Sequence, residues 1–117
     1  MNYLDYEFVE KWLAKLKFNW FNKNIDEAVN LFTKTTFYQE TPFMEPYTTL
    51  AEIEQEWQHV KNEDIHKVEF KILAIDKLTT IVEWYLEQND EIYDGIYEIK
   101  FNEKLECIYF KSWEIKI

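Results

Sequence analysis

Apolar residues recur at two different periods along this chain, every three or four positions in its first third and every second position in its second half. A spacing of three and four predicts a helix that buries one stripe. The stripe of the first helix consists of Leu4, Phe8, Trp12, Leu13, Leu16 and Trp20. The segment 22–24 ends this helix, because its Asn residues tolerate the left-handed conformation.

Two shorter helices are predicted to follow. Asn24 with Glu27 has the pattern of a helix cap and its reciprocal partner, and opens a second helix. Thr49 and Glu52 form a capping-box pattern, which opens a third helix that continues toward Val60.

Period-two alternation predicts the strands. They are expected over 35–41, 68–74, 82–86, 97–101 and 105–117. Short polar turns join the last four strands, which is typical of an antiparallel meander. Because the helices come first and the long strands last, the fold class is α+β. No run of Gly, Ser or Pro divides the chain, so we expect a single domain over residues 1–117.

Composition and charge exclude several classes of function. With 47% hydrophobic and 19% aromatic residues the chain has enough apolar surface to fold. Its net charge of -10, with 13 Lys and no Arg, argues against a nucleic-acid partner. No run of apolar residues is long enough to cross a bilayer and no signal peptide is recognised, so we expect no membrane partner and a cytoplasmic location.

Several residues in order along the chain carry a family resemblance. They are the short helix 26–32, the strand closed by Thr41-Pro42, Ile53 with Trp57, Trp84, the run 94–97 and Trp113. This order resembles the nuclear transport factor 2-like superfamily, and within it the SnoaL-like and ketosteroid-isomerase-like proteins. The resemblance implies a cone, in which three N-terminal helices pack in the concave face of a curved, mostly antiparallel sheet. It implies no single activity, because the superfamily hosts isomerases, cyclases, dehydratases, hydrolases and binding modules.

Large rings on faces that can point inward predict a pocket for a flat or apolar ligand. Aromatic stripes also form ordinary cores, so a cone filled by its own side chains is the alternative. The candidate ligand-binding residues are Trp20, Phe37, Gln39, Thr41, Trp57, Trp84, Tyr97 and Trp113. We expect no cofactor and no metal, since two His and Cys107 without ligand spacing make no metal motif, and a single Gly makes no phosphate loop.

In the ketosteroid-isomerase-like enzymes, the residue before the proline that closes the first strand is the proton-accepting carboxylate. Thr41 stands there in this chain, and Thr is no base near neutral pH. Glu40 lies one residue earlier, where regular alternation turns it to the opposite face unless a bulge rotates it inward. Tyr97 matches the position of the family's acidic hydrogen-bond donor, but the tyrosine of the first helix has no match. Glu40 and Tyr97 are therefore catalytic candidates.

A histidine and an aspartate provide a second catalytic hypothesis. The resemblance to dehydratases implies a His and Asp pair, which could form here if His66 faces inward beside Asp94. Otherwise we expect both His59 and His66 at the surface. The Asp–Arg–Asp arrangement of epoxide-hydrolysing relatives cannot form, because the chain has no Arg.

The second face of the sheet also carries apolar residues, among them Ile81, Tyr85, Ile108 and Phe110, and predicts a homodimer through that face. The leading functional hypothesis is a small-molecule-binding protein with an aromatic-lined pocket. One alternative is an isomerase, cyclase or dehydratase that acts on a small apolar or polycyclic substrate by general acid/base chemistry. Another is a protein-interaction module that uses the sheet face. Whether the chain is an enzyme is left open at this point.

Overall fold

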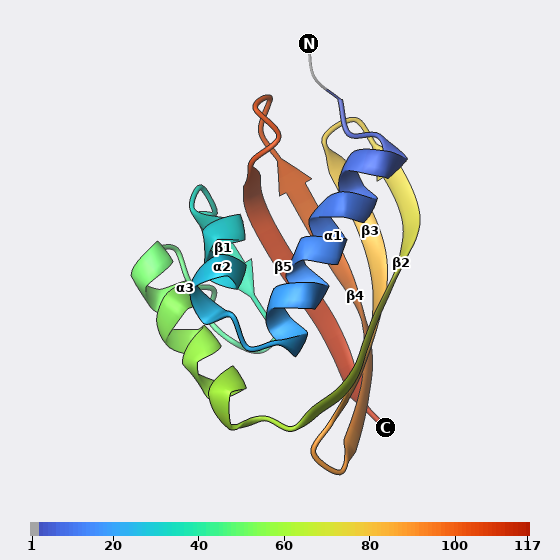
Figure 1. Ribbon diagram of the computed structural model, residues 1–117. Coiled ribbons are helices and arrows are strands. Elements are labelled where there is room, and N and C mark those ends of the chain that lie inside the picture. The colour runs from blue at the N-terminus through green and yellow to red at the C-terminus, as the bar shows by residue number, and fades with distance from the viewer. Residues whose placement is uncertain (1–2) are drawn as a thin grey trace.

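A computed structural model describes residues 3–117. Its helical segments are α1 (Tyr6–Phe21), α2 (Ile25–Val29), η1 (Asn30–Phe32), α3 (Leu50–Trp57) and η2 (Gln58–Asn62). Its strands are β1 (Phe37–Gln39), β2 (Ile65–Asp76), β3 (Thr79–Gln88), β4 (Glu91–Phe101) and β5 (Cys107–Lys116). The five strands form one curved sheet, and α1 lies across its concave side with α2 and α3 next to β1 (Figure 1). The predicted α+β class is confirmed.

The strand order is β1-β5-β4-β3-β2. Strands β2 to β5 pair antiparallel with their chain neighbours, as the meander prediction required. The short strand β1 pairs parallel with β5, and its register places Phe37 beside Tyr109 and Tyr38 beside Phe110. This pairing decides which residues of the first strand point inward.

Local sequence explains most helix boundaries. Asp5 caps α1 by accepting a 2.7 Å hydrogen bond from the backbone N–H of Phe8. The capping box of Thr49 and Glu52 is confirmed at the start of α3. The Asn24 side chain makes no cap hydrogen bond at α2, and its Nδ2 donates to Asn19 Oδ1.

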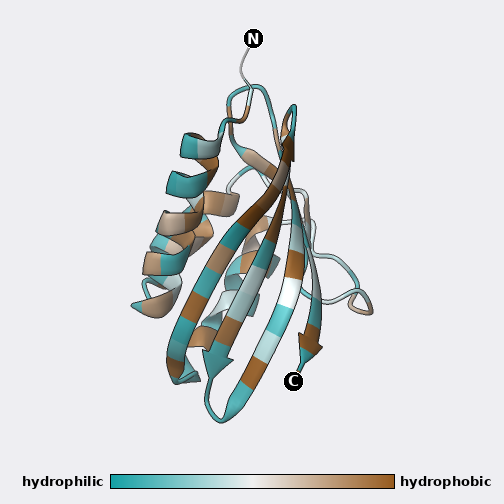
Figure 2. Cartoon of the chain, turned by 90° about the vertical axis from the view of Figure 1, so that its right-hand side faces the viewer, coloured by the Kyte–Doolittle hydropathy of each residue, from teal (hydrophilic) through white to brown (hydrophobic). Residues whose placement is uncertain are grey.

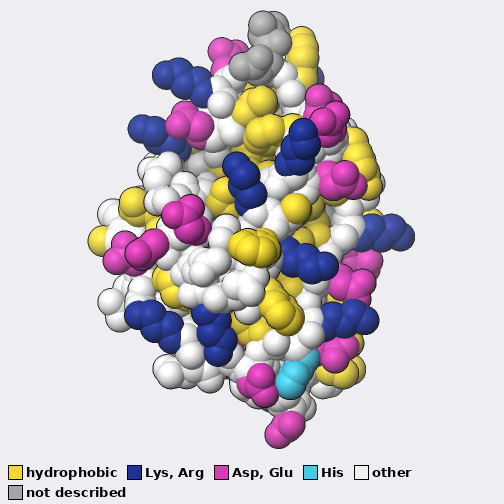
Figure 3. Space-filling view, in the orientation of Figure 1, with side chains coloured by type: hydrophobic (Ala, Val, Ile, Leu, Met, Phe, Trp, Pro, Cys, Tyr) yellow, Lys and Arg dark blue, Asp and Glu magenta, His cyan; other side chains and the backbone are white. Residues whose placement is uncertain are grey.

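The core between the helices and the sheet is rich in aromatic rings. Phe32 packs against Trp12, Tyr38, Phe110 and Trp57, with ring centroids 5.1–6.4 Å apart. Along the strands seen in Figure 2, hydrophilic and hydrophobic residues alternate, which is the pattern of a sheet with one buried face. On the helical face, Lys and acidic side chains are interspersed with apolar ones (Figure 3).

Within residues 3–117, no helix is both long and apolar enough to span a membrane.

Candidate functional site

A cavity of about 190 Å³ lies between the C-terminal half of α1, the end of α3 and the concave face of β3, β4 and β5. Its apolar wall is mostly aromatic. The rings are those of Trp20, Tyr38, Trp57, Trp84, Tyr93, Tyr97 and Phe110. Among its polar residues are Glu40, His59, Ser112 and Glu114. An apolar cavity of about 150 Å³ holds benzene, so this one is large enough for a single ring with a short substituent.

Gly95 allows the Trp84 indole to cross β4 and form one wall of the cavity. Trp84 lies opposite Gly95 in the register of β3 and β4, and its Nε1 donates a 3.0 Å hydrogen bond to Ser112 Oγ on β5. A Cβ on Gly95 would lie 2.5 Å from the indole ring. The indole also stacks on Tyr97, with ring centroids 5.5 Å apart and an interplanar angle of 20°. The wall is therefore held by both hydrogen bonding and stacking.

Glu40 carries its carboxyl group into this cavity. The Tyr38 hydroxyl donates a 2.7 Å hydrogen bond to Glu40 Oε2. Tyr38 is itself buried, and its ring stacks on Phe110 at a centroid distance of 5.3 Å. The donor is thus held by packing, which fixes the position of the carboxyl group that accepts from it.

Burial changes the acid–base properties of these groups. Loss of solvation raises the pKa of Glu40 to about 7, and the negative charges of Glu56 and Glu114 act in the same direction. The hydrogen bond from Tyr38 and the proximity of His59 lower that pKa but do not cancel the effect of burial. Burial also raises the pKa of Tyr38 and of Tyr97 well above the usual value, so both phenols keep their protons near neutral pH.

Two hydrogen-bond donors of the cavity wall are available to a ligand among the described residues. Trp57 Nε1 is buried without a bonded acceptor, and no hydrogen bond contributes to the raised pKa of the Tyr97 hydroxyl. Trp57 Nε1 lies near Tyr38, close enough to lower the pKa of that phenol. A buried donor without an acceptor costs free energy, so these groups favour a ligand that brings an acceptor atom.

The rim of the cavity is acidic. His59 lies 3.4 Å from Glu56 Oε2 and 3.4 Å from Glu63 Oε1, and the Tyr47 hydroxyl donates a 2.6 Å hydrogen bond to Glu56. Ligand atoms of Glu40, Glu56 and His59 all lie within 4.8 Å of one another. Glu40 and Glu56 already accept hydrogen bonds from Tyr38 and Tyr47, and Glu40 and His59 line the aromatic cavity.

Several predicted site residues meet in this cavity. Trp20, Trp57, Trp84 and Tyr97 line it, and so does Glu40. The expectation that regular alternation turns Glu40 away was wrong. Tyr38 pairs in register with the inward Phe110, and Glu40, which follows the end of β1, lines the same cavity.

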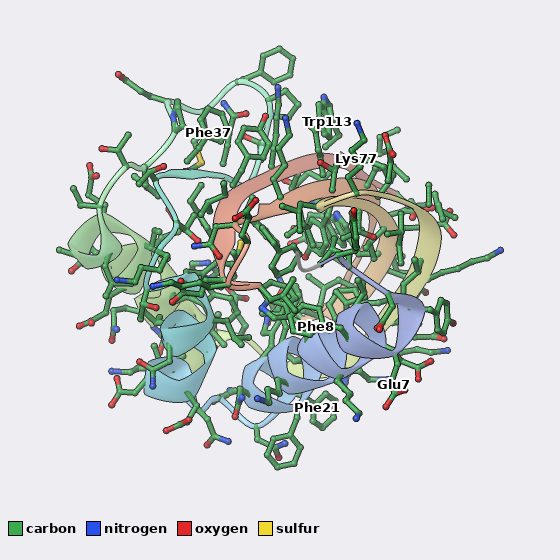
Figure 4. The ribbon with its side chains drawn as sticks, turned by 90° about the horizontal axis from the view of Figure 1, so that it is seen from above. Glu7, Phe8, Phe21, Phe37, Lys77 and Trp113 are labelled. Carbon is green, nitrogen blue, oxygen red and sulfur yellow. The ribbon has the colours of Figure 1, made fainter. Side chains whose placement is uncertain are left out.

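Four other predicted ligand-binding residues lie elsewhere. Phe37 stacks on Tyr109 at 4.5 Å on the outer face, and Trp113 lies on that face too (Figure 4). Thr41 lines an outer groove with Trp113. Gln39 is buried, and its side-chain nitrogen donates to the Met44 carbonyl. The register of β1 and β5 places all four outside the cavity, since the residues of β5 that face inward are Phe110, Ser112 and Glu114.

The proposed pair of His66 and Asp94 does not form within the cavity. The His66 side chain is 50% exposed and lies 3.5 Å from Asp64. Asp94 lies on the outer face, where it pairs in register with Tyr85 and Ile115. Neither residue lines the cavity.

Sequence reasoning missed the inward residues of β5 and the Tyr38 hydroxyl. It assigned Phe110 to the second face together with Ile81, yet Phe110 is buried in the core. Phe110, Ser112 and Glu114 are alternate residues of β5 and therefore share one face of the strand, which is the signal that could have placed them together in the cavity. It also placed His59 at the surface; the side chain is 44% exposed, but it reaches the rim.

Similar structures support the fold. One similar structure is that of SalBIII, an epoxide hydrolase/cyclase-like enzyme with a role in pyran ring formation in the polyether salinomycin. It has a TM-score of 0.74 at 9% identity, over 95% of this chain and 93% of that chain. An NTF-2 like protein of unknown function from Burkholderia xenovorans LB400 has a TM-score of 0.74 at 10% identity, over 92% and 83%. A steroid delta-isomerase from Pseudomonas aeruginosa has a TM-score of 0.68 at 13% identity, over 91% and 78%.

These similar structures show that the chain has the nuclear transport factor 2-like fold, as the resemblance implied. No protein-family model matches the chain, and no curated protein matches it in sequence. At these sequence identities the likeness shows the fold alone.

Proposed function

We propose that this chain binds a small, largely apolar molecule in the aromatic cavity and that Glu40 exchanges a proton with it. One observation carries the proposal: a carboxyl group with a pKa of about 7 lies in a ring-lined cavity with one oxygen held by Tyr38. A general acid or base works best when its pKa lies near the working pH. An ordinary surface carboxylate, with a pKa near 4, is a much weaker base.

Tyr97 supplies the complementary donor. Its hydroxyl stays protonated because burial raises its pKa, and no hydrogen bond contributes to that raised pKa. When Glu40 removes a proton from a ligand, negative charge develops on that ligand. A donor aimed at the atom that receives this charge stabilises it. Tyr97 and Trp57 Nε1 are the candidates for that role.

Proton transfer is the step that isomerases, cyclases and dehydratases share, and the proposal goes no further than that step. Proteins of similar structure carry names of all three kinds, including a scytalone dehydratase from Novosphingobium aromaticivorans DSM 12444. A cavity of about 190 Å³ is large enough to enclose about one ring with a short substituent, so a polycyclic substrate, one of the alternatives weighed above, would extend beyond it. The size of the cavity therefore favours a compact, single-ring ligand.

Binding without chemistry is the second candidate. It drew support from two missing groups, the carboxylate expected at Thr41 and the tyrosine of the first helix. Glu40 lines the cavity and supplies a carboxylate, whereas the helix tyrosine has no counterpart among the lining residues. The number of rings in the wall suits binding and catalysis equally.

Ring opening of benzisoxazole tests the proposal without knowledge of the natural substrate. A base removes the carbon-bound proton, the N–O bond breaks and 2-hydroxybenzonitrile forms, so a single proton acceptor in an apolar pocket is sufficient. We expect turnover that rises with pH through a midpoint of about 7 and is lost in Glu40→Gln. Glu83→Gln, which changes an exposed carboxylate on the outer face, is the matched control. Equal rates in wild type and Glu40→Gln would overturn the proposal.

We further propose that the outer face of the sheet pairs two copies of the chain. Ile115 and Ile117 at its edge are 71% and 74% exposed. Glu98 and Lys111 lie side by side on this face, and such mixed charges can complement themselves across a two-fold axis. The apolar patch and the paired charges support this proposal.

We propose the cytoplasm as the location of the protein. Its single cysteine, Cys107, is buried and unpaired, which suits a reducing compartment.

A further inference from the structure

The ionisable side chains around the cavity are almost all acidic. Glu40 follows β1, Glu56 lies on α3 and Glu114 lies on β5, so three separate elements bring carboxylates to one place. The chain has 13 Lys, yet no Lys lines the cavity in the part of the chain that the structure describes. Among the described residues His59 is the one basic group that lines the cavity, and it lies between Glu56 and Glu63. The interior of the cavity is therefore negative overall.

The aromatic wall reinforces this negative character. The faces of Trp and Tyr rings carry partial negative charge and attract cations. Trp20 and Trp57 meet edge to face with centroids 5.9 Å apart, and Trp84 stacks on Tyr97. An anionic ligand would lose its solvation and then meet Glu40 and Glu114 as well. A cation would meet ring faces and a carboxylate together.

From this arrangement we infer that the natural ligand is an amine: a single-ring or similarly compact apolar body that carries an ammonium group. Its nitrogen lies at Glu40, its apolar part lies against Trp57 and Trp84, and an acceptor atom on it lies within reach of the Tyr97 hydroxyl and Trp57 Nε1. The inference rests on the proposed function, because it uses the same cavity and the same carboxylate. It adds the charge and the size of the ligand. The volume of about 190 Å³ limits the body to about one ring and a short arm.

The ionisation of Glu40 links affinity to pH. The groups that face it are Tyr38 from β1, Glu56 and His59 from α3 and η2, Tyr97 from β4 and Glu114 from β5. An ammonium ion stabilises the charged form of the carboxyl group, so its binding strengthens as Glu40 loses its proton. A neutral ligand of the same shape gains nothing from that ionisation.

Three probes of nearly equal size test the inference: benzylammonium, benzyl alcohol and benzoate. Titrations followed by tryptophan fluorescence and checked by calorimetry give the affinities at about pH 8, above the pKa of Glu40. We expect benzylammonium to bind at least about tenfold more tightly than benzyl alcohol, and benzoate more weakly than either. In Glu40→Gln the ratio of the first two affinities should fall toward one. In Glu83→Gln it should stay as in the wild type.

Each other outcome has a defined meaning. Affinity for benzyl alcohol equal to or above that for benzylammonium, stronger binding of benzoate, or binding of none of the three would overturn the inference. Circular dichroism on Glu40→Gln excludes loss of folding as the cause of a changed ratio. Ammonium-selective binding without benzisoxazole turnover would contradict proton transfer but leave the inference standing. Turnover without ammonium selectivity would do the reverse.

Discussion

Tyr38 and Glu40 lie two residues apart and line the same cavity, and the Tyr38 hydroxyl donates a 2.7 Å hydrogen bond to Glu40 Oε2. This bond is the largest influence that lowers the pKa of Glu40, against the burial that raises it. The balance between these two influences keeps the pKa of Glu40 near neutral pH, in the range where the carboxyl group can both accept and return a proton.

Removal of the Tyr38 hydroxyl should raise the pKa of Glu40. In Tyr38→Phe the ring keeps its stack on Phe110, but the Glu40 carboxylate loses its hydrogen bond. The pKa of Glu40 should then rise by about one further unit. The pH profile of benzisoxazole turnover measures this as a midpoint displaced to higher pH. Tyr47→Phe, which removes a donor to Glu56 instead, serves as the control. A midpoint displaced to lower pH would contradict the assignment.

Glu40 should also make the stability of the protein depend on pH. Its pKa is about 7 in the folded chain, against an ordinary value of 4.5. A raised carboxyl pKa means that the folded state binds the proton more tightly, so stability falls as pH rises from about 4.5 to about 7. Glu40→Gln removes this loss. It should raise the free energy of unfolding by about 3 kcal/mol at about pH 8 and leave it nearly unchanged at about pH 4.

Urea unfolding at both pH values measures this effect. Glu83→Gln, on the outer face, should show no such difference between the two pH values. If Glu40→Gln were less stable than the wild type above neutral pH, the ionised Glu40 side chain would be stabilising. That result would contradict the claim that burial of the carboxylate lowers stability.

Gly95 should be intolerant of even one added methyl group. A Cβ at this position would lie 2.2 Å from the Trp113 carbonyl oxygen and 2.5 Å from the Trp84 ring. We expect Gly95→Ala to lower the free energy of unfolding by about 1–3 kcal/mol. Because the indole must move, part of that loss should disappear in a Trp84→Leu background, which a double-mutant cycle measures. Equal losses in both backgrounds would mean that the Trp84 contact is not the cause.

The proposed dimer depends on the outer face. Ile115→Glu places a charge in the exposed apolar patch and should give a monomer by sedimentation equilibrium or light scattering. Phe18→Glu makes a similar change at a residue of α1 that is 61% exposed, and should leave the dimer intact. A wild-type monomer at high concentration, or a dimer that survives Ile115→Glu, would refute this interface.

The fold could be predicted from the sequence because each element carries its own period. The stripe that includes Trp12 and Leu16 is buried in α1, and the alternation around Trp84 is that of β3. The capping box at Thr49 marks the start of α3. These signals are local, so neighbouring residues are sufficient to read them.

The site was harder to predict because it depends on register between distant segments. Both sides of the first strand carry an aromatic residue, Phe37 on one and Tyr38 on the other. Only the pairing with β5 decides that Tyr38 and Glu40 face inward. A shift of one residue reverses every side chain of a strand, which is why Thr41 and Trp113 were expected inside and lie outside.

Titration of the Glu40 side-chain carboxyl carbon by NMR measures the central property of this account without any substrate. Selective labelling of glutamate, with Glu40→Gln used to assign the resonance, allows its midpoint to be followed through neutral pH. A midpoint of about 7 is the expected result. A midpoint near the ordinary glutamate value of 4.5 would show that the carboxyl group is solvated and that the cavity does not hold a proton-transfer residue.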